Sequence, residues 1–213
     1  MGKISQGVLG GFSGKVGNIV GGTWKGIDYM RIKPSNVSNP KTQGQLDQRS
    51  KFSKVLNFLQ PMTEFLRVGF KLYAIKMTQF NSAMSYNLNN AITGAYPNFT
   101  IDYSKALVSR GSLVGSAGAS VASTNPGVVE LSWTDNSGSG NAKGTDKALL
   151  VVYNATKGYA VYDTAGATRA TLSQNLTVPS DFSGGSVEAF IGFISEDGKE
   201  VANSVYIGSV TVA

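Results

Sequence analysis

The sequence contains no cysteine and no histidine among its 213 residues. Without cysteine the chain forms no disulfide, no thiolate nucleophile and no cysteine-ligated zinc or iron–sulfur site. Without histidine it lacks the commonest general base and metal ligand near neutral pH. Lysine, tyrosine and paired carboxylates are the remaining candidates for catalysis, and no such pair is evident. We therefore expect no catalytic residue, no cofactor and no metal, and a protein that is not an enzyme.

Long apolar runs are also missing. No continuous apolar stretch of the length of a signal-peptide core follows the first residues. Residues 4–22 are interrupted by glycine and carry Lys15, which makes them too polar to cross a bilayer. We expect no membrane insertion and a protein that is cytoplasmic as made, with a place in a virion or an extracellular assembly left open.

Charge is scarce, and it is unevenly distributed. The net charge is +6, but residues 1–94 hold 12 Lys and Arg against three acids, whereas residues 95–213 hold seven against ten. Such asymmetry indicates a polyanionic partner or a head-to-tail neighbour of opposite charge.

Glycine is abundant at the start of the chain, where it occupies nine of the first 26 positions. Residues 1–34 therefore read as glycine-punctuated extended structure, with the best strand composition over 23–33 and an end at Pro34. Apolar residues at helical spacing follow in three stripes. Pro61 separates the first stripe from the second, and the third begins at Phe80 and runs to Gly94.

From Phe99 the apolar period changes from helical to alternating. Short strands at this spacing predict a β-sandwich. The Asp-Gly within residues 196–200 predicts a polar hairpin turn. The expected strands are 99–103, 106–113, 127–134, 147–153, 158–163, 167–174, 186–195 and 201–212. The sets expected to face the core are Val129, Leu131 and Trp133; Leu149, Val151 and Tyr153; and Ala189, Ile191 and Phe193.

The predicted fold class is α+β. A glycine-rich β segment with helices, residues 1–94, forms a basic assembly region. An all-β sandwich of the immunoglobulin or fibronectin type III kind, residues 95–213, follows it.

The basic residues of the first half are the best functional lead. Trp24 and Tyr29 lie among them, which suits base stacking beside phosphate contacts. The same residues suit a solvated face or a docking surface for a neighbouring subunit. The candidate residues for assembly or polyanion binding are Lys15, Trp24, Lys25, Tyr29, Arg31, Lys33, Lys41, Arg49, Lys51 and Lys54.

Two stretches resemble known proteins. The first is Gly10–Asn18 running on to Trp24–Arg31, and the second is Pro34 with Asn39–Thr42, Gln45, Arg49 and Phe52. Together they resemble a bacterial family known as a domain of unknown function, over the whole chain. Residues 10–55 are also similar to small proteins of phage structural gene clusters. The family implies no activity and no catalytic residues, and the phage-like similarity implies an assembly component.

The second half is similar to a fibronectin type III or immunoglobulin-like module through residues 131–133 and 148–153. Such modules usually bind or space rather than catalyse. We expect a non-enzymatic, self-assembling structural subunit of a filament, phage-like particle or surface assembly, with further copies of itself as partners. The alternatives are a nucleic-acid-binding protein that uses the basic first half, and an adhesive or carbohydrate-binding β module.

Overall fold

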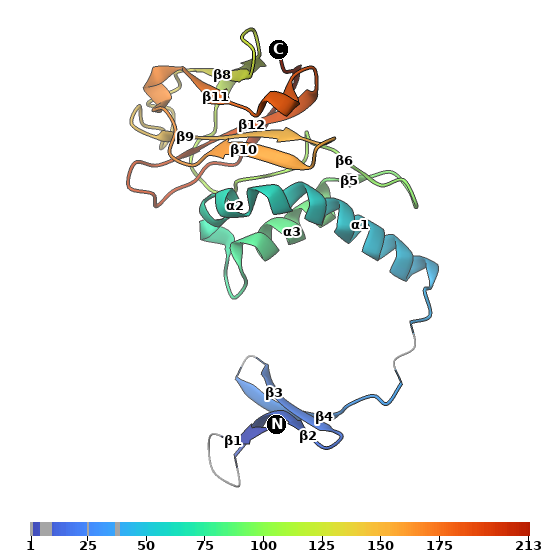
Figure 1. The fold of residues 1–213 in the computed structure, drawn as a ribbon. Helices are drawn as coiled ribbons and strands as arrows, with labels where there is room; N and C mark the ends of the chain where they lie inside the picture. The colour runs from blue at the N-terminus through green and yellow to red at the C-terminus, as the bar shows by residue number, and fades with distance from the viewer. Residues whose placement is uncertain (1, 5–9, 25, 37–38) are drawn as a thin grey trace. The chain divides into compact units, whose positions relative to one another are not determined.

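The computed structural model describes residues 2–4, 10–24, 26–36 and 39–213. The chain divides into two compact units, residues 1–42 and 43–213 (Figure 1). The predicted boundary after residue 94 differs from this division. The helices of residues 43–94 share a hydrophobic core with the C-terminal strands, so they belong to the second unit.

The N-terminal unit is a four-stranded antiparallel sheet in the order β1-β2-β3-β4. The predicted extended, glycine-rich segment is therefore a sheet, but residues 23–33 do not form one strand. Residues 23 and 24 end β3, and Gly26 lies in the turn before β4 with a φ of 83°, which costs glycine little. The strands are β1 (Lys3–Ile4), β2 (Phe12–Val16), β3 (Ile19–Trp24) and β4 (Ile27–Ile32).

The C-terminal unit begins with the predicted helices, α1 (Gln43–Leu59), α2 (Thr63–Gly69) and α3 (Gln79–Asn90). Pro61 lies in a short 3-10 turn, Gln60–Met62, between α1 and α2. The Thr78 hydroxyl caps α3 by accepting a hydrogen bond from the Asn81 N–H at 3.2 Å. Further 3-10 turns span Lys71–Tyr73, Arg169–Thr171 and Ser180–Phe182. No helix in the described part of the chain combines the length and the apolar character needed to cross a membrane.

Two antiparallel sheets follow, in the strand orders β10-β9-β12-β13 and β11-β8-β7. A two-stranded pair, β5 and β6, links the helices to them. The strands are β5 (Ile92–Thr93), β6 (Thr100–Ile101), β7 (Ala117–Ala122), β8 (Val128–Thr134), β9 (Lys147–Asn154), β10 (Tyr159–Asp163), β11 (Ser173–Thr177), β12 (Ser186–Ile194) and β13 (Val205–Thr211).

Three strand predictions differ from the structure. Residues 167–174 do not form one strand, because residues 169–171 form a 3-10 turn and β11 begins only at Ser173. Residues 106–113 form no strand, because backbone N–H groups at Val108 and Ser109 donate to the Ser204 hydroxyl, at 2.9 and 3.3 Å, instead of to a neighbouring strand. Residues 117–122 form β7, paired with β8, although their small side chains carry no strand signal in the sequence. Strand pairing supplied by β8 decides the conformation there.

The sheet of β9 and β12 is buried on both faces, and this arranges the unit in three layers (Figure 1). One face shares a core with β8, which includes Leu131 and Trp133 as predicted. The other face packs against α1, α2 and α3. Leu149, Val151 and Tyr153 are buried as predicted, but they face the helices and not the second sheet. The predicted α+β class is confirmed.

Candidate functional site

The N-terminal sheet has two chemically different faces, and its strand pairing shows which residues share each face. Val20 of β3 pairs with Lys15 of β2 and with Arg31 of β4. Residues directly opposite each other in an antiparallel sheet point to the same side, as do alternate residues along a strand. We call the part of this side formed by β3 and by the residues paired with it the aromatic–basic face; it comprises Lys15, Val20, Gly22, Trp24, Ile27, Tyr29 and Arg31.

A shallow hollow of about 340 Å³ lies on the aromatic–basic face, lined by Trp24, Ile27 and Tyr29. These side chains are 63%, 65% and 46% exposed. Lys15 and Arg31, both exposed, lie at the other end of the same face, in the row of Val20. Trp24 lies four residue steps along β3 from Val20, a length of about 13 Å. Aromatic surface and positive charge therefore lie on the same face of the sheet.

Two adjacent glycines allow aromatic side chains to approach the backbone of β3. A β-carbon at Gly22 would lie 3.3 Å from the hydroxyl oxygen of Tyr29, on the aromatic–basic face. A β-carbon at Gly21, on the opposite face, would lie 2.0 Å from the carbonyl oxygen of Phe12 and 2.8 Å from its ring. Glycine at these positions therefore shapes both faces of the sheet.

The opposite side of the sheet, here called the apolar face, carries Val16, Ile19, Gly21, Met30 and Ile32, and Phe12 lies against Gly21 on this side. Met30 and Ile32 are 69% and 77% exposed. Asp28 lies at one end of this face, where its carboxylate accepts a hydrogen bond from the Thr23 hydroxyl. Among the described residues of this unit, Gly21 alone is buried. The unit therefore exposes the kind of surface that sheets normally cover.

The structure brings four of the predicted residues together, because Lys15, Trp24, Tyr29 and Arg31 all lie on the aromatic–basic face. Lys33 directly follows β4, and its backbone N–H donates to the Asn18 carbonyl oxygen at 2.7 Å.

The other predicted residues lie elsewhere. Lys25 is outside the described residues, and Lys41 is exposed in the segment before α1. Arg49, Lys51 and Lys54 lie on α1 in the C-terminal unit, where the Lys51 ammonium lies 5.0 Å from the centre of the Phe99 ring. These three belong to a different compact unit from the aromatic–basic face.

Sequence reasoning did not find Ile27 as part of the hollow, or the apolar face as a surface. By composition, residues 23–33 read as one strand, within which Trp24, Ile27, Tyr29 and Ile32 are not assigned to separate faces. The turn at Gly26 places Trp24 and Ile27 opposite each other, while Ile32 points to the other side from Tyr29. Counting alternation separately before and after Gly26 would have separated the two faces.

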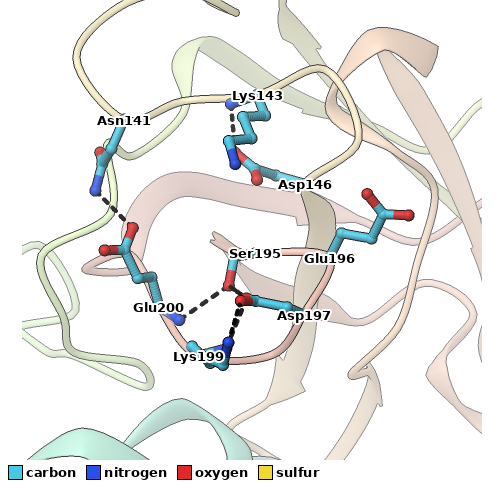
Figure 2. A pocket seen from close by; sticks show the side chains of 8 residues that line it. All are labelled: Asn141, Lys143, Asp146, Ser195, Glu196, Asp197, Lys199 and Glu200. Carbon is cyan, nitrogen blue, oxygen red and sulfur yellow. Dashed lines mark hydrogen bonds and ion pairs between the residues drawn. The ribbon is translucent and has the colours of Figure 1, made fainter.

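A second hollow, of about 540 Å³, lies in the C-terminal unit (Figure 2). The Glu196–Glu200 segment is the predicted turn, closed by a hydrogen bond from the Ser195 N–H to the Glu200 carbonyl oxygen at 2.9 Å. The hydrogen bond from the Ser195 hydroxyl, followed by those from Lys199, lowers the pKa of Asp197 to about 2. The hollow is lined by Asn141, Lys143, Asp146, Ser195, Glu196, Asp197, Lys199 and Glu200.

Asp146, which lines the second hollow, is engaged in holding loops together. It is buried, and its Oδ2 accepts hydrogen bonds from the Lys143 N–H at 2.8 Å and from the buried Arg169 at 3.2 Å. Arg169 also donates to the carbonyl oxygens of Val114 and Gly115, at 2.9 and 3.0 Å. Burial lowers the pKa of Arg169, an effect that Asp146 opposes. The ion pair between Asp146 and Arg169 stabilises three loops. Because this role is structural, we favour the N-terminal sheet over the second hollow as the candidate site.

Comparisons with known proteins address the family and the fold. The model of a family of unknown function, DUF6266, matches residues 11–208. A comparison with curated proteins finds no match. The fn3 domain of human collagen alpha-1(XX) chain is similar to the chain with a TM-score of 0.37 and 15% identity, over 49% of this chain and 91% of that one. This likeness is low, and the arrangement of the two sheets rests on the strand pairings.

Proposed function

The chain belongs to the DUF6266 family, a family of unknown function, and we propose that it is a non-enzymatic structural subunit that assembles with further copies of itself through its N-terminal sheet. The observation that carries this proposal is the exposed apolar face. The form of the assembly, whether filament, phage-like particle or surface structure, is to be read from electron micrographs.

The apolar face supports the proposal because a sheet is stabilised when its hydrophobic face packs against another element. Small sheets become independently stable when three or more strands share such a face or pack against a helix. Val16 and Ile32 are more than half exposed, and Met30 lies between them and the polar end of the face. A second copy offers an identical apolar surface, so face-to-face packing of two sheets would cover both.

The edges of the sheet support the same role. β4 is an edge strand of six residues, all of them exposed, whereas β1 at the other edge has two residues. An exposed edge presents unpaired backbone N–H and C=O groups that a strand from another chain can satisfy. β4 contains no proline to prevent such pairing. We infer that the neighbouring subunit contacts the apolar face, the β4 edge or both.

The test is the particle mass of the full-length protein, measured by analytical ultracentrifugation over a range of concentrations, with electron microscopy of the largest species. We expect assembly without nucleic acid that persists at high salt, because the contact is apolar. Met30→Asp together with Ile32→Asp should reduce the protein to monomers.

The matched control is Ile75→Asp, which changes an equally exposed apolar residue in the C-terminal unit. This variant should assemble like the unmodified protein. Assembly that survives the Met30 and Ile32 substitutions contradicts the proposal. The proposal is also contradicted if the Met30 and Ile32 variant is monomeric only because residues 43–213 have unfolded. Circular dichroism would detect such unfolding.

A further inference from the structure

We propose that the aromatic–basic face of the N-terminal sheet binds single-stranded nucleic acid. The proposal rests on three features of this face: two exposed aromatic side chains beside a hollow, two cations on the same face, and the absence of a carboxylate there. It concerns the opposite side of the sheet from the apolar face, so it does not depend on self-assembly.

The aromatic side chains provide surfaces for base stacking. Trp24 and Tyr29 line the hollow together with Ile27, which pairs with Trp24 across the two strands. Base–aromatic stacking tolerates every base, since each has a π face. The bases must first be free of a duplex, because paired bases already stack on one another. An exposed sheet face with two aromatic rings therefore suits a single strand better than a double helix.

The cations provide phosphate contacts at the appropriate place. Lys15 and Arg31 lie in one row of the face, joined through Val20, and about 13 Å from the row of Trp24. A strand whose bases stack at the aromatic end would pass its backbone over these cations. The N-terminal unit has six Lys and Arg and a single acid, Asp28. Asp28 lies on the apolar face, so it does not repel a phosphate on the aromatic–basic face.

An acidic protein segment is the competing occupant. It would use Lys15 and Arg31 but would make no use of two adjacent exposed rings as stacking surfaces. Charge complementarity alone suits both ligands. The aromatic pair therefore favours nucleic acid, and the dependence of binding on Trp24 separates the two.

The experiment measures binding of short fluorescent oligothymidylate and oligouridylate to the full-length protein by anisotropy, together with tryptophan emission. The chain has two tryptophans, and Trp133 is buried, so quenching by the oligonucleotide reports Trp24. We expect quenching, and an affinity for either oligonucleotide that falls with salt by a slope of about −0.7 per phosphate contact. A duplex of the same length should bind more weakly.

The variants separate stacking from charge. Trp24→Ala should weaken binding by about 5- to 150-fold, the effect of losing one stacked base, whereas Trp24→Phe should retain most of it. Arg31→Ala should weaken binding and reduce the salt slope by about 0.7. Ile75→Ser is the control, because Ile75 is an equally exposed apolar residue but lies in the C-terminal unit. It should bind like the unmodified protein.

Several outcomes would overturn the proposal. One is the absence of Trp24 quenching with both oligonucleotides. Another is unchanged affinity in Trp24→Ala together with equal displacement by polyglutamate, which would identify an acidic protein surface as the ligand. A third is tighter binding of duplex than of single strands. A fourth is an equal loss of affinity in Ile75→Ser and Trp24→Ala, which would show that binding is not specific to the aromatic–basic face.

Discussion

Phe58 of α1 packs edge-to-face against Tyr153 of β9, with ring centres 5.2 Å apart and ring planes inclined by 76°. Phe58 also contacts Phe190 of β12 and Tyr103, at centre distances of 6.0 and 5.7 Å. Aromatic pairs of this geometry add to the stabilisation from buried area. The first helix therefore packs directly against the sandwich. The change from helical to alternating apolar spacing after residue 94, taken alone, suggests a domain boundary between them.

The first prediction concerns this fastening. Phe58→Ala should lower the free energy of unfolding by about 3–5 kcal/mol, because it leaves a cavity between helix and sheet. Urea unfolding would be followed by circular dichroism for the helices and by Trp133 emission for the sandwich, in a Trp24→Phe background. Both signals should shift together. Phe52→Ala, a change at a half-exposed residue of the same helix, should cost clearly less. If the helix signal shifts alone, the helices unfold separately from the sandwich, and a domain boundary lies after residue 94 as the sequence predicts.

The second prediction concerns the buried Arg169. Arg169→Met removes the partner of buried Asp146 and the donors to two loop carbonyls, and should cost about 3–5 kcal/mol of stability. The control is Arg67→Met, which breaks an exposed pair with Glu64, 2.9 Å long, and should cost less than about 1 kcal/mol. Calorimetric unfolding measures both. Equal losses would mean that the hydrogen bonds and ion pair of Arg169 stabilise the fold no more than an exposed ion pair does, and that methionine replaces the contact of the guanidinium with the Phe193 ring, 3.8 Å away.

The third prediction concerns the two glycines of β3. Gly21→Ala should destabilise the N-terminal sheet by about 1–3 kcal/mol, because the new methyl group meets the Phe12 backbone. Gly22→Ala should cost less, since it meets the exposed and movable end of Tyr29. Hydrogen exchange of residues 12–24, measured by mass spectrometry, compares them. Faster exchange in Gly22→Ala than in Gly21→Ala would contradict the close approach of β2 to β3 at Gly21.

The fourth prediction concerns alkaline pH. Partial burial, and then the hydrogen bond that its hydroxyl donates to Glu188, raise the pKa of Tyr206 from 10 to about 12. The folded protein thus keeps a proton that the unfolded chain loses, so the associated stability is lost as pH rises from 10 to about 12. Carbon NMR of labelled tyrosine should show that Glu188→Gln lowers this midpoint. Glu130→Gln, on the other sheet, should leave it unchanged.

Several features of the protein were determined by the sequence alone. Absent cysteine and histidine exclude thiolate and imidazole chemistry whatever the fold. The pattern of apolar residues located β8, β9 and β12. It does so because at least every second residue of such a strand is buried. Pro61 marked the break between α1 and α2, because it lacks the N–H that a helix interior needs. The asymmetry of charge is likewise a property of composition.

Other features were decided only by the tertiary structure. Alternation shows which residues share a side of a strand, but not what covers that side, so it could not reveal that Leu149 and Val151 face helices. The position of Arg169 in the interior depends on an acid and carbonyl groups distant in the sequence. The separation of Trp24 and Tyr29 from Met30 and Ile32 depends on strand register across Gly26. Each is set by contacts between distant segments, which local propensity does not encode.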